Sequence, residues 1–210
     1  MKKWYPVVLV LLTAAFSAWA YPRMPERVVT HWGLFGEPNG WSSRLSTVLE
    51  FPALMALFAA LFFGIRELDP RKANYKKFAQ SFDVIVVAVL FAIAAIHVMI
   101  IGVALGWPIP IRRAAPAVVG LLLLTLGNVL PRVRPNSFIG IRNPWTFSDN
   151  DSWSLAQRLA GYGLVVSGAL FLLDGAVATP WADTLAISAT VVAVVGTTLY
   201  SVVRGISSGG

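Results

Sequence analysis

Long apolar runs recur along this chain, and they constrain its fold more than any other feature of the sequence. A transmembrane helix needs about 20 mostly apolar residues. Six runs approach that length, at 4–20, 48–65, 82–106, 112–130, 159–173 and 185–203. Hydrophobic residues make up 57% of the chain, charged residues only 13%, and the mean hydropathy is +0.69. The sequence therefore predicts an all-α polytopic membrane protein with six transmembrane helices.

The basic residues predict the orientation of these helices. The stretch 66–77 holds Arg66, Arg71, Lys72, Lys76 and Lys77 against two acids. The predicted loops on the same side hold most of the other basic residues, whereas the opposite loops hold Arg23, Arg27, Arg44, Arg112 and Arg113. Because cytoplasmic loops carry the excess of lysine and arginine, we expect both termini in the cytoplasm.

The first apolar run allows two interpretations. Lys2 and Lys3, the apolar residues that follow and the ending Ala18-Trp19-Ala20 are typical of a cleaved signal peptide. Trp4 and Trp19 at its ends are typical of a retained helix with aromatic anchors. We favour retention, and in both cases the next segment is delivered outside.

The outer segment 21–47 is polar and long enough for structure of its own. Pro25 suits the first turn of a short helix, with Met24, Val28 and Trp32 on one face and Gly33 at its end. Asn39-Gly40 predicts a turn that returns Trp41 beside Trp32 on the outer membrane surface. In the next span, Glu50 and Pro52 are expected in the first helical turn.

The inner segment 136–146 is the longest non-periodic stretch between two apolar runs, and it predicts a loop of defined shape. It contains Asn136, Gly140 and Pro144, which favour turns and restricted backbone conformations. Arg142 and Trp145 give this loop a charge and an amphipathic ring, although an ordinary membrane-surface connector would also use such a tryptophan. The polar residues 148–152 then predict the N-cap of the fifth helix.

Two features suggest helix packing or function inside the membrane. His97 lies near the middle of the third span, where it is a candidate functional group or a structural hydrogen-bonding residue. Ala189, Ala193 and Thr197 form a small-residue stripe on the sixth span, and Gly163 and Ser167 on the fifth could face it. Every acid is assigned to one of the two surfaces, including Asp174 and Asp183 on the outside.

The sequence argues against several classes of protein. It has no cysteine, and its two histidines cannot form a metal cluster alone. It also has no nucleophile, phosphate-loop, dinucleotide or zinc-peptidase motif. We therefore expect no enzyme, no metal and no cofactor, and we attribute the net charge of +7 to membrane topology rather than to direct nucleic acid binding.

Segment 136–146, followed by Trp153, resembles the hallmark of the SdpI-type immunity proteins, bacterial membrane proteins that guard against a secreted toxic peptide. The residues that carry the resemblance are Asn136, Gly140, Arg142, Pro144 and Trp145. The outer segment resembles a small domain of unknown function that often precedes that family, through His31, Trp32, Gly36, Pro38 and Trp41.

This resemblance implies a protein of the bacterial cytoplasmic membrane that resists a peptide such as SdpC and can recruit an ArsR-type repressor. It also implies a division into 1–66, with two helices and an ordered outer loop, and 67–210, with four helices. Membrane lipids are expected partners of both parts. The alternative is a small-molecule transporter or lipid-handling protein with a cavity around His97.

Overall fold

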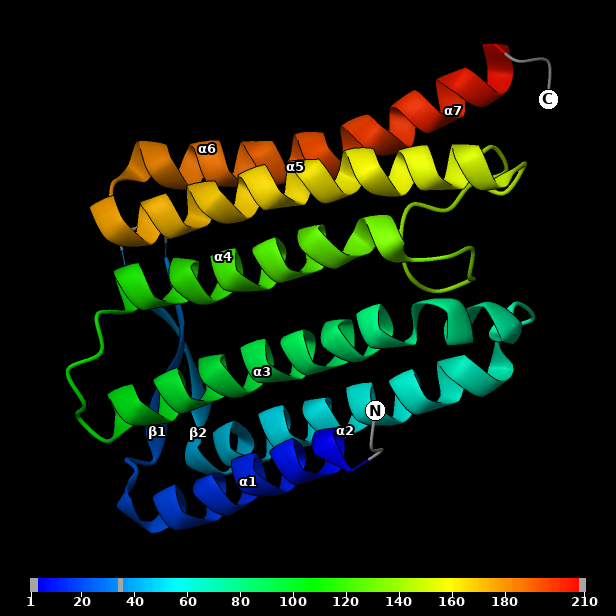
Figure 1. The fold of residues 1–210 in the computed structure, drawn as a ribbon. Coiled ribbons are helices and arrows are strands. Elements are labelled where there is room, and N and C mark those ends of the chain that lie inside the picture. The colour runs from blue at the N-terminus through cyan, green and yellow to red at the C-terminus, as the bar shows by residue number, and fades with distance from the viewer. Residues whose placement is uncertain (1–3, 34–35, 208–210) are drawn as a thin grey trace.

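The helices of the computed structural model, which describes residues 4–33 and 36–207, lie side by side as a bundle (Figure 1). They are α1 (Tyr5–Ala20), α2 (Arg44–Leu68), α3 (Ala79–Ala104), α4 (Ile111–Val129), α5 (Asn150–Val177), α6 (Pro180–Val191) and α7 (Thr197–Ser207). The 3-10 segments η1 (Tyr21–Arg23), η2 (Lys72–Phe78) and η3 (Leu130–Arg132) extend three of them, and a π-helical segment, η4 (Val192–Gly196), joins α6 to α7. Within the described residues, six helical segments are long and apolar enough to cross a membrane, which confirms the predicted fold class. Lys2 and Lys3 lie outside the described residues.

Capping residues set where two of the long helices begin. The carboxylate of Asp149 accepts hydrogen bonds from the amides of Asp151 and Ser152, both at 2.8 Å, and caps α5 as predicted. Ser43 caps α2 by accepting from the Ser46 amide at 3.1 Å. The predicted start of α2 was wrong: the helix begins at Arg44, so Glu50 and Pro52 lie inside it rather than in its first turn.

The segment 21–47 forms a β-hairpin and not the short helix that we predicted. Strands β1 (Arg27–Trp32) and β2 (Pro38–Ser43) pair antiparallel, with irregular register around His31. Asn39-Gly40 lies inside β2 and not at the turn, and Trp32 and Trp41 pair with other residues. Val28 and Trp32 do share one environment, as predicted, because a spacing of four residues suits a strand face as well as a helix face.

The hairpin runs across the helices rather than along them (Figure 1). Val28 is buried with Met24, Ile100 and Ile101, and Trp32 packs against the same cluster. A second, larger core cluster includes Met55 of α2 and Leu90 of α3. The hairpin is therefore attached to the first three helices by apolar packing.

Glycines bring α4 and α5 into close contact. A methyl group at Gly120 would lie 2.8 Å from the Gly168 carbonyl, and one at Gly127 would lie 2.6 Å from the Gly161 carbonyl. Gly163 faces Ala193 of η4, in agreement with the predicted partner of the small-residue stripe. Small residues permit such close approach of helices in a membrane.

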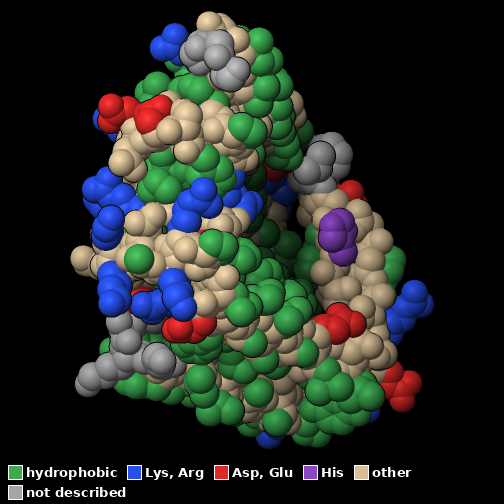
Figure 2. Space-filling view, turned by 90° about the vertical axis from the view of Figure 1, so that its right-hand side faces the viewer, with side chains coloured by type: hydrophobic (Ala, Val, Ile, Leu, Met, Phe, Trp, Pro, Cys, Tyr) green, Lys and Arg blue, Asp and Glu red, His purple; other side chains and the backbone are tan. Residues whose placement is uncertain are grey.

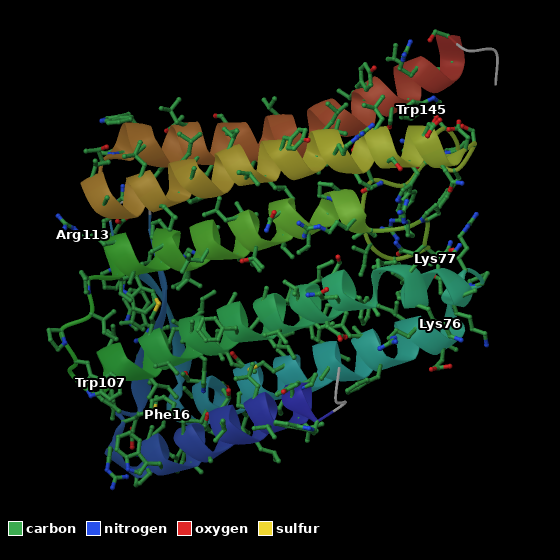
Figure 3. All side chains as sticks on the ribbon, in the orientation of Figure 1. Phe16, Lys76, Lys77, Trp107, Arg113 and Trp145 are labelled. Atoms are coloured by element: carbon green, nitrogen blue, oxygen red, sulfur yellow. The ribbon has the colours of Figure 1, made fainter. Side chains whose placement is uncertain are left out.

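The bundle has two different ends. One carries the hairpin, and Phe16, Trp107 and Arg113 lie near it (Figure 3); we call it the hairpin end. The other carries Lys76, Lys77 and Trp145 (Figure 3). We call this the basic end because lysine and arginine side chains gather on it (Figure 2).

Candidate functional site

At the basic end, the loop 136–146 is folded around the side chain of Asn136. The Asn136 Oδ1 atom accepts hydrogen bonds from the amides of Phe138 and Ile139, at 2.9 and 2.6 Å. Its Nδ2 atom donates to the carbonyls of Arg134 and Ile139, at 2.9 and 3.0 Å. Asn136 is fully buried, so it shapes the loop from within.

The middle of the loop is fastened to α5 by Gln157. The Gln157 Oε1 atom accepts from the Ile141 amide and its Nε2 atom donates to the Ile141 carbonyl, both at 3.0 Å. Gly140 next to it has a φ of 104°, and a side chain there would collide with the Gln157 amide. The glycine is required both for this backbone conformation and for the close approach of Gln157.

The second half of the loop is a turn that docks on α7. The Asn143 side chain accepts from the Thr146 amide at 3.0 Å and donates to the Ser201 hydroxyl, and the exposed Pro144 lies between the two ends of the turn. Trp145 meets Tyr200 edge to face, with ring centroids 6.4 Å apart. The turn is therefore held in a fixed position relative to the last helix.

Arg142 and Trp153 have opposite environments. Arg142 is exposed, and its guanidinium donates to the Ser137 carbonyl. Trp153 is 1% exposed, donates to the Val133 carbonyl at 2.7 Å and stacks on Phe147 at 5.4 Å. Of the predicted inner residues, Arg142 is available to a partner, whereas Asn136 and Trp153 support the loop from inside.

Sequence reasoning missed Asp69, which joins this loop to the basic segment 66–77. Asp69 is 2% exposed and accepts from the Ser137 amide at 2.8 Å, the Ser137 hydroxyl at 2.9 Å and the Tyr75 hydroxyl at 2.9 Å. Burial raises the pKa of Asp69, but hydrogen bonds from Ser137, Arg71 and Tyr75 together hold this pKa below its ordinary value. The only local signal for this role was an aspartate before Pro70 at a helix end.

The predicted outer residues form the hairpin and its turn. His31 bonds to the Asn39 side chain and pairs with Gly40, whose missing side chain makes room for it. Gly36 has a φ of 81° and faces Arg112 at the start of α4. The other three differ in exposure: Trp32 is partly buried, whereas Pro38 and Trp41 are exposed.

Two acids that we assigned to the surface are buried in an ion-pair network at the hairpin end, so that assignment was wrong. Asp174 of α5 is fully buried and binds both terminal nitrogens of Arg112, at 3.0 and 3.2 Å. Asp183 of α6 binds the same guanidinium at 2.7 Å. The partners are far apart in the chain, so no local pattern reveals the network.

The intramembrane candidate, His97, is fully buried in α3. Its Nε2 atom lies 2.7 Å from the Ser17 hydroxyl of α1, and its ring lies 5.1 Å from that of Phe51 of α2. His97 thus joins the first three helices. Across residues 4–33 and 36–207, no three histidine, aspartate or glutamate side chains are placed to hold a metal ion.

Six apolar helices, an ordered polar corner at one end and a hairpin at the other define a multi-pass helical membrane protein. Comparison with known proteins finds two families to which parts of the chain are similar. Residues 132–203 match the SdpI/YfhL protein family, and residues 8–56 match a domain of unknown function, DUF1648. The resemblance to the SdpI-type immunity family is therefore confirmed.

One curated relative is similar over most of the chain. It is the immunity protein SdpI of Bacillus subtilis (strain 168), which is 25% identical over 162 residues, covering 77% of this chain and 75% of that protein. No solved structure matches the chain. The match to residues 132–203 includes the loop 136–146 and Trp153, and the other match includes the hairpin.

Proposed function

We propose that this chain is a non-enzymatic immunity protein of the bacterial cytoplasmic membrane that gives resistance to a secreted toxic peptide. The observation that carries this proposal is the ordered loop 136–146, which lies within the segment that matches the SdpI/YfhL family. The basic end faces the cytoplasm in this proposal because lysine and arginine are retained there. Both termini then lie inside, and segments 1–66 and 67–210 act as parts of one membrane unit.

The two ends have separate roles in this proposal. At the outer surface, the hairpin and the helices beneath it meet a peptide of the SdpC type. At the inner surface, Arg142 and Trp145 recruit an ArsR-type repressor. Arg142 supports this role because it is exposed on a loop that Gln157 and Asn136 hold in place, and arginine and tryptophan often dominate binding surfaces.

The test is the sensitivity of a host that expresses this chain to the toxic peptide. Expression should protect the host, and deletion of 136–146 should abolish protection. Replacing Arg142 or Trp145 by alanine should impair recruitment of the repressor to membranes without changing insertion of the protein. Arg132→Ala, which removes another exposed arginine at the same end, is the matched control. Unchanged recruitment in the Arg142 and Trp145 variants would contradict the proposal that these two residues recruit the repressor.

The alternative of transport or lipid handling around His97 receives less support. The imidazole is packed between Ser17 and Phe51 and is fully buried, as expected for a residue that joins helices. A His97→Ala variant that keeps protection but loses thermal stability would agree with this packing role. Loss of protection with unchanged stability would instead favour the transporter.

A further inference from the structure

A cavity lies between the hairpin and the helices and opens to the surface. It has a volume of about 290 Å³, and side chains from β1, α3, α4, α5 and α6 line it. A space-filling view shows the hollow beside the hairpin, which projects from the side of the bundle (Figure 2). Ile96, Ile100, Val119 and Phe171 make most of its depth apolar.

The cavity has two polar parts: Thr30 and His31 on the hairpin, and the ion-pair network on the opposite helices. Arg112 and Asp183 line the cavity, while Asp174 is completely enclosed behind them. The guanidinium binds Asp174 through two nitrogens and Asp183 through one. The side chain of Asp183 is only 8% exposed, so this carboxylate faces the cavity rather than open water.

The charges of this network do not balance. One guanidinium faces two carboxylates, and the two bonds to Asp174 already pair one carboxylate with the arginine. A net negative charge in a largely buried, partly apolar site is costly unless another positive group approaches it or one carboxyl group takes up a proton. Asp183 is the acid that reaches the cavity, so a positive group bound in the cavity would balance the network without such a proton.

We propose that this cavity binds a primary ammonium group attached to a compact apolar group, with the Asp183 carboxylate as its counter-ion. The apolar walls hold the hydrocarbon part, and Asp183 holds the charge. A cavity of this volume is close to the lower end of ordinary ligand sites, about 300 Å³. The ligand is thus the size of a side chain or a short alkyl chain, and a whole folded partner would not fit.

This chemistry has two sources at a bacterial membrane. One is the amino terminus or a lysine of an amphipathic toxic peptide, in which case the inference deepens the proposed function and rests on it. The other is the headgroup of an amine-bearing lipid. Both present an ammonium group beside apolar atoms.

Methionine methyl groups offer a direct measurement of binding. The chain has only four methionines, and Met99 lines the cavity whereas Met55 belongs to the larger core cluster. The protein is labelled with ¹³C-methyl methionine in phosphatidylglycerol nanodiscs and titrated with n-octylammonium. We expect a saturable shift of the Met99 signal and none of the Met55 signal. Equal shifts with n-octanol or n-octanoate would overturn the inference.

Variants identify the counter-ion. Asp183→Asn should weaken octylammonium binding at least about tenfold, because the charge that holds the ammonium is removed. Glu26→Gln, which neutralises an exposed acid before β1, should leave binding unchanged. The Met55 signal reports whether each variant is folded. Unchanged affinity in a folded Asp183→Asn variant would overturn the proposal.

Two further titrations distinguish the sources. If a lipid fills the site, replacing phosphatidylglycerol by phosphatidylethanolamine should shift Met99 and compete with octylammonium. If the peptide fills it, the toxin should compete, and blocking its amines by acetylation should abolish that competition. The octylammonium titration needs no toxin, so its failure refutes the cavity assignment alone, whereas failure of expression to protect a host refutes the proposed function alone.

Discussion

Asp69 accepts hydrogen bonds from both the backbone amide and the hydroxyl of Ser137, a residue 68 positions later in the chain. This pair fastens the end of α2 to the loop that carries Arg142. Asn74 adds a second link by donating to the Pro135 carbonyl at 2.8 Å. The loop is therefore positioned by the connection between α2 and α3, to which both Asp69 and Asn74 belong.

Replacing Asp69 by asparagine should destabilise the protein by about 2–4 kcal/mol. An amide has one acceptor oxygen where the carboxylate has two, and hydrogen bonds to a charged acceptor contribute about 1.5–3 kcal/mol each. Thermal unfolding in detergent, followed by tryptophan fluorescence, would measure the loss. Glu67→Gln changes an exposed acid two residues away and should unfold like the unchanged protein. Equal stability of the two variants would contradict the role of Asp69.

The same carboxylate should make stability depend on pH at acidic values. The pKa of Asp69 is lowered in the folded protein, so its contribution is fully present above the unfolded pKa of about 3.9 and is lost as the pH falls through the lower folded pKa. Unfolding temperatures measured between pH 6 and pH 2, a range of about four units across this transition, should fall less steeply in Asp69→Asn than in the original chain. Parallel curves would exclude Asp69 as the titrating group.

Replacing glycine by alanine should lower the stability of the protein where α4 packs on α5, but not at an open position of α2. At Gly127 or Gly161, a methyl group would meet backbone atoms of the facing helix, and such overpacking costs about 1–3 kcal/mol. At Gly64 of α2, the nearest neighbour is a flexible Leu68 side chain at 3.8 Å, so Gly64→Ala should be neutral or stabilising. Thermal unfolding of the three variants would test this, and three equal values would contradict close packing of α4 on α5.

The features that could be predicted from the sequence are those carried by local patterns. Apolar runs located the six spans, and the polar residues 148–152 located a helix start. The spacing of small residues predicted that Gly163 faces Ala193. The hairpin was missed because the spacing of Val28 and Trp32 suits a helix and a strand equally. The arginine network was missed because its partners are brought together only by packing of α4, α5 and α6.

Orientation in the membrane can be tested because the chain contains no cysteine. We expect Glu26→Cys, at the hairpin end, to react with a membrane-impermeant maleimide added to intact cells. Lys76→Cys, on an exposed residue at the basic end, should react only after the cells are opened. Labelling of position 76 in intact cells would reverse the proposed topology and place Arg142 outside.

Retention of α1 can be tested through its contact with α3. Ser17 bonds to His97, and Ala20 at the end of α1 is fully buried. Cleavage after Ala20 would remove these contacts, so we expect the protein isolated from membranes to keep residues 4–20. Intact mass measurement would decide, and a mature chain that begins at Tyr21 would establish the signal-peptide interpretation instead.

The Gln157 amide should control the order of the loop 136–146. Gln157→Leu removes both bonds to Ile141, and a loss of about 1.4 kcal/mol would speed local amide exchange about tenfold. Hydrogen exchange in residues 137–146 should therefore accelerate, while the rest of α5 stays protected. Gln80→Leu, on an exposed residue of α3, is the matched control.

Gln157→Glu separates the two bonds made by this side chain. Glutamate keeps an acceptor for the Ile141 amide but cannot donate to the Ile141 carbonyl. Exchange in the loop should then fall between that of the original chain and that of Gln157→Leu. If repressor recruitment follows the same order in the three proteins, a preformed loop is what the partner recognises, because Arg142 itself is unchanged in all of them. Recruitment that is equal in all three would show that the partner imposes the loop shape on binding.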